Sequence, residues 1–421
     1  MVSAKVLRAA LIFSLLAPAF SYGADQPPPA GAPAPAPEGP KPLSPGLLGL
    51  EPLIGPIDDA VDNAKAAISK AIGIDVSGFL DVGYQYSSNH PRDSRSITGR
   101  YFDKDHNKFI FNNFNMTIEK PEKDWGVGFK IVGDFGRTGE LLREATLWSA
   151  HLHQQCCIEL REAFLTTTIP FGEGIQVKAG KFVTPLGTEI LPAPGAYNDN
   201  ISRSFLFNFA VPLTHTGVLF TYPFTKAFAA SAGVVTGWDN PHDNNNSPSF
   251  LGGVNITFSD ALSLASNMTL GREWSPASFD GHIHDGGVRF VISNVATFKA
   301  SDLMTVYGEY TLGAEEKALT PGGVHSAWWH GLAGILSLNW TDRFNTAFRG
   351  EYFRDADGAR TGTRHLDLFE ATATAAYKFT AKLLGRAEIR QDVADHNFFK
   401  LGRNNADRAQ TTFALQGIYT F

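Results

Sequence analysis

Two histidines and two adjacent cysteines form a first group of candidate metal ligands. His151 and His153 precede Cys156 and Cys157 by a few residues. Such side chains can bind zinc or copper, and adjacent cysteines can also form a vicinal disulfide in an oxidising compartment. A weaker group follows at His282, His284 and Asp285. Because polar histidines are common in loops, we assign no metal and no cofactor to either group.

The sequence offers no motif of an enzyme active site. It contains no Gly-x-Ser-x-Gly elbow, no glycine-rich phosphate-binding loop and no His-Glu-x-x-His. Its 12 histidines fall mostly in segments that we interpret as loops, which disfavours a buried catalytic triad. We therefore expect no catalytic residues and no enzyme activity.

A further group consists of charged residues that alternate with apolar ones inside short segments. The basic members are Lys130, Lys178, Arg289, Arg349, Lys378, Arg386 and Arg390, and the acidic members are Asp81, Asp134, Glu309, Glu351, Glu370, Glu388 and Asp392. An arginine or lysine in the middle of a lipid-facing surface costs about 2–4 kcal/mol. These side chains must therefore point inward, into water.

The inward charges balance, with seven bases against seven acids in the two sets just given. A ring of one sign would select ions, and this balance does not assign an ion preference. Five of the charges lie in neighbouring late segments and could pair across them: Arg349, Glu351, Arg386, Glu388 and Arg390. Two interpretations stay open, because the charges could line a pore and contact solutes or could stiffen its wall.

The segments that carry these charges have the period-two pattern of β-strands. In the first, Leu80, Val82 and Tyr84 fall on one face, whereas Asp81 and Gln85 fall on the other. Sixteen such segments cover 76–87, 109–119, 125–136, 157–169, 174–182, 213–223, 227–238, 250–258, 262–272, 286–298, 302–313, 327–340, 344–355, 367–379, 383–392 and 409–421. The number is even, and most segments reach the ~9–11 residues that a tilted strand needs to cross a bilayer.

The connections between these segments alternate strictly in length. The short ones are 120–124, 170–173, 224–226, 259–261, 299–301, 341–343 and 380–382. The long ones are 88–108, 137–156, 183–212, 239–249, 273–285, 314–326, 356–366 and 393–408. This alternation is typical of an outer-membrane barrel with short periplasmic turns and long outer loops, and a soluble β-sandwich has no reason to show it. Both ends of the barrel would then lie on the periplasmic side.

The composition favours an all-β protein, here a closed antiparallel transmembrane β-barrel. Phe is frequent at 32 of 421 residues and Gly at 41, while Met is 4 and Cys is 2. No apolar run after residue 23 is long enough for a membrane-spanning helix, which leaves a barrel as the way to cross a bilayer. Lys and Arg total 36 against 42 Asp and Glu, and the net charge of −6 disfavours nucleic acid as a partner.

Three segments precede the barrel, which we assign to 75–421. Residues 1–23 have the basic start, apolar run and small-residue end of a secretory signal peptide. Residues 24–56 are rich in proline and predict an extended periplasmic tether. Residues 57–74 predict a short amphipathic helix with Gly73 as its C-cap. This helix could plug the barrel or lie loosely before the first strand.

The connection 183–212 is the longest of the long loops and the least polar. Exposed apolar surface costs ~25 cal/mol per Å² in water, so we expect the loop to fold into the barrel and narrow the pore. Glu189, Asp199 and Arg203 would then be the charges nearest the constriction. In the alternative, the loop packs against a neighbouring subunit.

Three short motifs carry a resemblance to a known family, and a fourth resembles a feature of outer-membrane proteins in general. They are Gly180–Glu189 (GKFVTPLGTE), Pro212–Gly217 (PLTHTG), Ser77–Tyr84 (SGFLDVGY) and the closing Gly417–Phe421 (GIYTF). The first three resemble the putative beta-barrel porin-2 (OmpL-like) family, and the last resembles the aromatic C-terminal strand by which outer-membrane proteins are recognised for insertion. The resemblance implies an outer-membrane porin and supplies neither a substrate nor catalytic residues.

We interpret the chain as an outer-membrane porin through which small hydrophilic solutes or ions diffuse passively. Its expected partners are outer-membrane lipid, the solutes, and the barrel-insertion machinery through the C-terminal strand, with a homo-oligomer as a further option. One alternative is a binding or structural barrel whose loops contact a surface partner. A less favoured alternative is an outer-membrane hydrolase.

Overall fold

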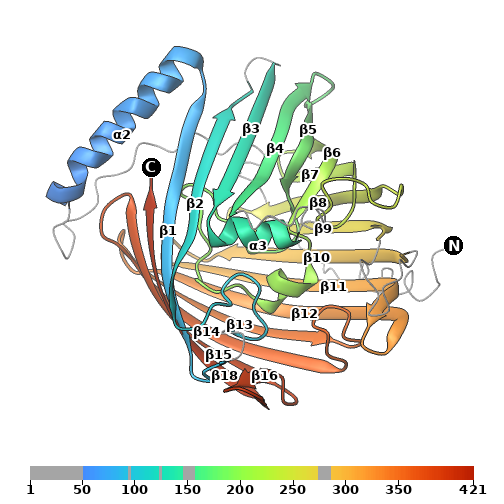
Figure 1. Cartoon of the computed structure of the whole chain (residues 1–421). Helices are drawn as coiled ribbons and strands as arrows, with labels where there is room; N and C mark the ends of the chain where they lie inside the picture. The colour runs from blue at the N-terminus through green and yellow to red at the C-terminus, as the bar shows by residue number, and fades with distance from the viewer. Residues whose placement is uncertain (1–50, 93–95, 123–125, 146–156, 274–285) are drawn as a thin grey trace.

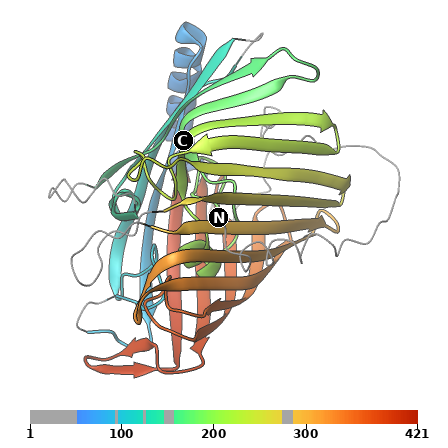
Figure 2. The same ribbon diagram turned by 90° about the vertical axis from the view of Figure 1, so that its right-hand side faces the viewer.

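Sixteen antiparallel strands close into one barrel (Figures 1 and 2). The computed structural model describes residues 51–92, 96–122, 126–145, 157–273 and 286–421. Each barrel strand is hydrogen-bonded to the strands before and after it in the chain, and the first strand pairs with the last to close the wall. The expected fold class and strand number are confirmed.

The strands and helices have the following bounds. The barrel strands are β1 (Asp75–Ser87), β2 (Lys108–Lys120), β3 (Val127–Phe135), β4 (Ile158–Ile169), β5 (Ile175–Val183), β6 (Thr214–Thr225), β7 (Phe228–Val235), β8 (Ser249–Ser259), β9 (Leu262–Arg272), β10 (Val288–Lys299), β11 (Met304–Thr320), β12 (Gly323–Asn339), β13 (Phe344–Asp355), β14 (Leu366–Lys378), β15 (Leu383–Ala394) and β18 (Ala409–Thr420). A separate hairpin consists of β16 (Phe399–Leu401) and β17 (Asn405–Asp407). The helices are α2 (Glu51–Ile72), α3 (Arg137–Ala145) and the π-helix η2 (Leu206–Ala210).

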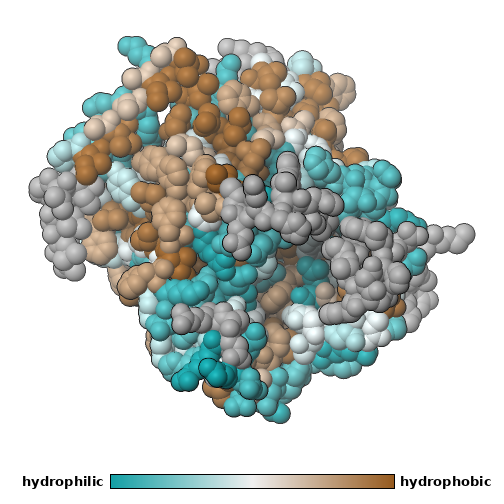
Figure 3. Space-filling model, viewed as in Figure 1, coloured by the Kyte–Doolittle hydropathy of each residue, from teal (hydrophilic) through white to brown (hydrophobic). Residues whose placement is uncertain are grey.

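Successive side chains along each barrel strand point alternately to the lipid and to the interior, as the period of two requires. On β13, Phe348 is 46% exposed, whereas its neighbours Ala347 and Arg349 are 0% and 2% exposed. Apolar side chains that point outward form the surface that meets lipid. Figure 3 shows such hydrophobic residues gathered over α2 and the neighbouring wall, and hydrophilic residues near the centre of the view.

The prediction of one long loop, at 314–326, is wrong. The connection 314–326 is instead a turn at 321–322, because β11 and β12 continue through most of it and are 17 residues long each. Ala318 pairs with His325 and Thr320 with Gly323, so the strands run past the length needed to cross a bilayer. The sequence Pro321-Gly322 supplies the turn.

The helix before the barrel begins earlier than expected. It starts at Glu51 rather than at residue 57 and ends at Ile72, so part of the expected tether is helical. Pro52 falls in the first turn, where a missing N–H costs nothing, and Pro56 follows within the helix. Gly73 has φ of +66° and donates its N–H to the Ser69 carbonyl at 2.8 Å, which is the expected C-cap.

A second short helix, α3, was not expected, and it begins inside the long loop after β3. Gly139 lowers its helix propensity, yet a Cβ at this position would lie 2.5 Å from the Asp134 carbonyl oxygen, so the close approach requires glycine. The helix buries Leu141 and Leu142. Among the described residues, no helix has the length and apolar character needed to cross a membrane.

Apolar side chains also pack inside the barrel, around the connection between β5 and β6. Phe205 and Leu206 of this loop are 0% exposed and share one cluster with Trp329 of β12 and Phe353 of β13. A second cluster joins Leu191, Phe207 and Leu213 of the loop to Leu142 of α3. The loop is therefore packed against the inner wall as a folded structure with its own core.

Candidate functional site: a loop held inside the barrel

The loop at residues 184–213 is fixed to the wall by carboxylates that accept its backbone N–H groups. Glu351 of β13 accepts from the amides of Phe205 and Leu206, both at 2.6 Å. Glu388 of β15 accepts from those of Ile201 and Ser202 at 2.6 and 3.0 Å. Charged acceptors make stronger hydrogen bonds than neutral ones, so each carboxylate is a firm attachment point.

The first part of the loop is held in the same way by β10 and β11, which lie in the same arc of the wall as β13 and β15. Glu309 of β11 accepts from the amide of Thr188 at 2.8 Å and from the hydroxyl of Thr311 at 2.9 Å. The amide of Gly187 donates to the hydroxyl of Ser293 on β10 at 3.2 Å. The two parts of the loop are thus attached side by side along one arc of the wall, from β10 to β15.

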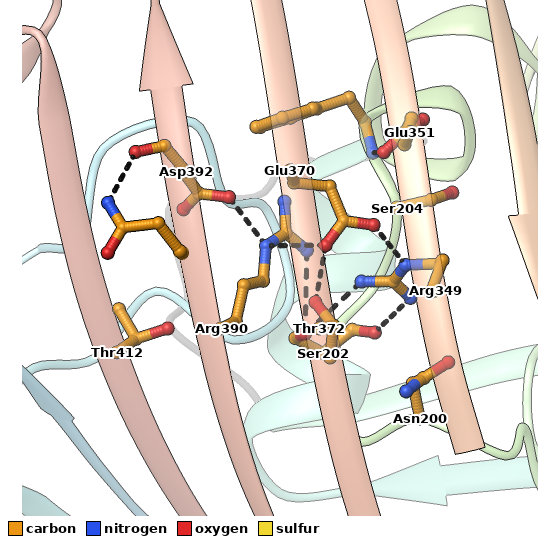
Figure 4. A network of polar contacts seen from close by, with 12 residues as sticks. Asn200, Ser202, Ser204, Arg349, Glu351, Glu370, Thr372, Arg390, Asp392 and Thr412 are labelled. Atoms are coloured by element: carbon orange, nitrogen blue, oxygen red, sulfur yellow. Dashed lines mark hydrogen bonds and ion pairs between the residues drawn. The ribbon is translucent and has the colours of Figure 1, made fainter.

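Arginines on the same strands complete the attachment (Figure 4). Arg349 contacts Glu370 at 2.5 Å and Glu189 of the loop at 2.9 Å, and it donates to the Ser202 carbonyl at 2.7 Å. Arg390 contacts Asp392 at 2.6 Å and donates to the Arg203 carbonyl, also at 2.6 Å. Figure 4 shows Arg349 and Arg390 converging on Glu370 beside Ser202.

The network continues into the first outer loop. Arg100 lies 2.6 Å from Asp392 and forms an ion pair with Asp103. Asp392 also accepts from the side chain of Gln410 at 2.8 Å. Wall, interior loop and outer loop therefore share one connected set of charges.

These charges do not face open water, contrary to our expectation. Arg349 is 2% exposed, Arg390 1%, Glu370 5% and Asp392 0%. The expectation treated the wall alone, and the loop that covers the wall removes the water. Ions buried in this way need oppositely charged and hydrogen-bonding partners, and this network provides such partners from three segments.

The remaining predicted wall residues fall into several environments. Lys130 is partly exposed, 3.8 Å from Glu119, and Lys378 is exposed at the end of β14. Lys178 lies 4.9 Å from the ring centre of Phe164 and 5.6 Å from that of Phe182. Arg289 pairs with Glu315 through two contacts of 2.8 and 2.9 Å. Arg386 donates to the Gln416 side chain and to the Asn198 carbonyl.

The two other predicted wall aspartates, Asp81 and Asp134, are buried among amide donors. Asp81 accepts from Asn112 at 2.9 Å and from Gln416 at 2.7 Å. Asp134 accepts from Asn113 and Asn115 at 2.8 and 2.7 Å.

Of the predicted loop charges, Glu189 and Arg203 are buried and Asp199 is half-buried. Glu189 accepts from the Ser204 amide at 2.8 Å in addition to its contact with Arg349. The guanidinium of Arg203 lies over the ring of Phe207 at 5.4 Å.

Sequence reasoning missed Arg161, which is 1% exposed inside the barrel. It donates to the Pro192 carbonyl of the loop at 2.7 Å and lies 3.3 Å from Asp134. The pairing of β3 with β4 skips one residue at this position, because Val132 pairs with Glu162 and Gly133 with Leu160. The run Glu159, Arg161, Glu162 breaks the alternation of two, and that break is the sequence signal of a bulge.

The end of the loop is fixed outside the strands by Asp239, which follows β7. Asp239 accepts from the amides of Leu213 and Thr214 at 2.7 and 2.9 Å. Burial raises the pKa of this carboxyl to about 6, although both hydrogen bonds act in the opposite direction. Burial also lowers the pKa of Arg360 to about 10, and its guanidinium lies 4.6 Å from the Trp238 ring.

Among the described residues, the candidate metal ligands do not form a metal site. Cys157 is exposed, while Cys156, His151, His153, His282, His284 and Asp285 lie outside the described residues. Within the described ranges, no group of three or more His, Cys, Asp or Glu side chains is arranged to hold a metal ion.

Comparison with known proteins agrees with the geometry of this barrel. The profile of the putative beta-barrel porin-2, OmpL-like family matches residues 73–421. The chain belongs to this family. It is an outer-membrane porin, and the resemblance noted from its motifs is confirmed. No curated protein matches the chain by sequence.

Solved structures share the fold at low sequence identity. The outer-membrane channel DcaP of Acinetobacter baumannii is 13% identical with a TM-score of 0.56, over 83% of this chain and 97% of that one. OmpT of Vibrio cholerae in its trimer form is 13% identical with a TM-score of 0.56, over 83% and 99%. OprB of Pseudomonas putida is 11% identical with a TM-score of 0.55, over 90% and 99%.

Proposed function

We propose that the loop at 184–213 is the constriction of a channel through which small hydrophilic solutes or ions diffuse. The observation that carries this proposal is the attachment of the loop to opposite parts of the wall. Glu309, Glu351 and Glu388 hold it from β11, β13 and β15, and Arg161 holds the Pro192 carbonyl from β4, which lies across the barrel. A loop held at several points inside a barrel reduces the cross-section that is open to solutes. A sixteen-stranded barrel is otherwise wide enough for an aqueous channel.

We further propose that the wall charges divide into two sets. The buried set around Arg349, Arg390 and Glu370 stiffens the constriction, because its side chains hydrogen-bond to the loop and to one another. The partly exposed set, which includes Lys130, Asp199 and Lys378, meets water and solutes. The two interpretations that the sequence left open therefore apply to different residues.

The proposal also covers export, membrane insertion and oligomerisation of the protein. Export through a signal peptide at 1–23 would precede insertion, and Gly417–Phe421 would present the C-terminal strand to the insertion machinery. Outer-membrane lipid covers the apolar wall. OmpT of Vibrio cholerae, a structural neighbour, has a trimer form, and we propose a homo-oligomer here as well. The protein acts as a channel without catalysing a reaction.

Replacing 188–209 by a short Gly/Ser link tests the constriction. Single-channel conductance in planar bilayers should rise and larger sugars should pass, while heat-modifiable migration shows that the barrel is folded. Unchanged conductance in a folded and inserted variant would remove the loop from the pore and favour a contact between subunits. A native chain that inserts and conducts nothing would favour a binding or structural barrel.

A further inference from the structure

The helix α2 is fixed to the outside of the barrel rim. Tyr419 donates its hydroxyl to Asp58 of α2 at 2.6 Å, and Lys382, in the turn between β14 and β15, contacts Asp62 at 2.7 Å. Tyr419 shares a face of β18 with Phe413 and Leu415, which are 48% and 59% exposed. That face is the lipid side of the wall, so α2 does not plug the channel. Figure 1 likewise shows α2 beside β1 on the outside.

The helix presents an apolar stripe whose isoleucines the barrel leaves exposed. Ile57, Val61, Ala64, Ile68 and Ile72 recur at three- and four-residue steps and fall on one side of the helix. The three isoleucines are 58%, 39% and 62% exposed in chain order. The attachment to the rim uses a neighbouring polar side instead, through the two aspartates.

Asp59 and Lys70 of α2 lie on the side opposite this stripe. The helix carries four acids, Glu51, Asp58, Asp59 and Asp62, against two bases, Lys65 and Lys70, so its net charge is 2 − 4 = −2. A helix with an apolar side and a charged side is suited to lie in the plane of a membrane interface. Its negative net charge excludes electrostatic attraction to anionic lipid as the main source of binding.

We propose that α2 lies in the periplasmic leaflet of the outer membrane, with its isoleucine stripe among the lipid chains. The partner is the lipid surface that surrounds the barrel, because the stripe starts at Ile57, beside the Asp58 that Tyr419 of the lipid-facing wall contacts. Leu80 and Val82 of β1, 39% and 52% exposed, belong to that wall. The helix thereby anchors the segment before the barrel to the membrane, and binding depends on apolar contact rather than on lipid charge.

Site-specific fluorescence on the full-length protein tests this placement. On a Cys156→Ser, Cys157→Ser background, single cysteines at Ile57, Ile68 and Ile72 are labelled with an environment-sensitive dye. Asp59→Cys and Lys70→Cys, on the opposite side of α2, are the matched controls, and Leu415→Cys is the reference for lipid contact. The protein is inserted in phosphatidylcholine vesicles with or without phosphatidylglycerol.

We expect the stripe positions to match Leu415: blue-shifted emission and quenching by spin-labelled lipid several-fold stronger than at Asp59 and Lys70. Phosphatidylglycerol should leave this difference unchanged. Equal quenching by aqueous iodide on both sides of α2 would overturn the proposal. Disulfide formation between protomers at Ile68→Cys would also overturn it and would assign the stripe to a second copy of the chain. Heat-modifiable migration verifies that each variant is folded.

Discussion

Arg349 and Glu189 lie 2.9 Å apart inside the barrel, although 160 residues separate them in the chain. The same guanidinium contacts Glu370 on the neighbouring strand at 2.5 Å. One arginine therefore joins the wall to the loop and compensates two buried carboxylates. The position of the loop depends on this single side chain more directly than on any surface charge.

Removing this arginine should destabilise the protein. In Arg349→Ala, Glu189 and Glu370 keep their burial and lose their shared partner, which we expect to cost about 3–5 kcal/mol in the free energy of unfolding. Urea unfolding in detergent micelles measures this change. The matched control is Lys378→Ala, at an exposed inward-facing position of β14. An equal and small effect in both variants would contradict a structural role for the Arg349 network.

Two adjacent tryptophans on β12 provide a second test, because they point to opposite sides of the wall. Trp329 is 0% exposed, packs in the cluster with Phe205 and Leu206, and donates to the Ala210 carbonyl at 3.2 Å. Trp328 is 42% exposed on the lipid side. Trp329→Ala should cost about 3–5 kcal/mol in the free energy of unfolding because it leaves a cavity.

Trp329→Phe should cost about 1 kcal/mol, mainly through the lost hydrogen bond. Trp328→Ala is the control and should change the free energy of unfolding far less than Trp329→Ala. Unfolding of the three variants in the same micelles separates these effects. A larger loss in Trp328→Ala would mean that the assignment of faces on β12 is reversed.

The strands could be predicted from sequence because their signal is local. Alternation of apolar and polar residues repeats within each segment, and lipid on one side makes that alternation strict. The alternation did not predict the outer ends of β11 and β12, since beyond the bilayer an apolar face is no longer required. It also missed α3, which is short and contains Gly139.

The contacts of the candidate site could be predicted only in part. Periodicity indicated that Glu351 points inward, and apolar composition indicated that the loop folds into the barrel. The partner of Glu351 is the amide of Phe205, 146 residues away, and no local pattern specifies which backbone group a carboxylate will meet. Burial of Arg349 follows from this loop placement, so it could not be derived from the strand alone.

Thiol accessibility should distinguish the two sets of wall charges. On the cysteine-free background, Lys130→Cys should react quickly with a small charged thiol reagent, because Lys130 is partly exposed inside the barrel. Arg349→Cys should react slowly while the loop covers it and quickly when 188–209 is replaced by the Gly/Ser link. Ile131→Cys, at a position 42% exposed to lipid, is the control and should stay unreactive in vesicles. Reaction at Ile131 without reaction at Lys130 would mean that the register is shifted by one residue.

Asp239 should make stability depend on pH, with a sign that follows from its burial. Its pKa is raised from the ordinary 3.8 to about 6, so the unfolded chain loses the proton at lower pH than the folded protein does. The contribution of Asp239 to the free energy of unfolding is therefore full below about pH 4, falls as the pH rises, and is lost above about pH 6, a change of about 3 kcal/mol. Asp239→Asn removes this titration and can still accept the amides of Leu213 and Thr214.

The unfolding free energy of the native protein, minus that of Asp239→Asn, should thus decrease between about pH 4 and about pH 7. Arg360 stays charged throughout this range, because its pKa of about 10 lies above it. Asp302→Asn, at an exposed position in the turn after β10, is the control and should leave the pH dependence of stability unchanged. A difference between native protein and Asp239→Asn that is constant or increases with pH would contradict the burial of this carboxyl, and with it the attachment that fixes the end of the loop.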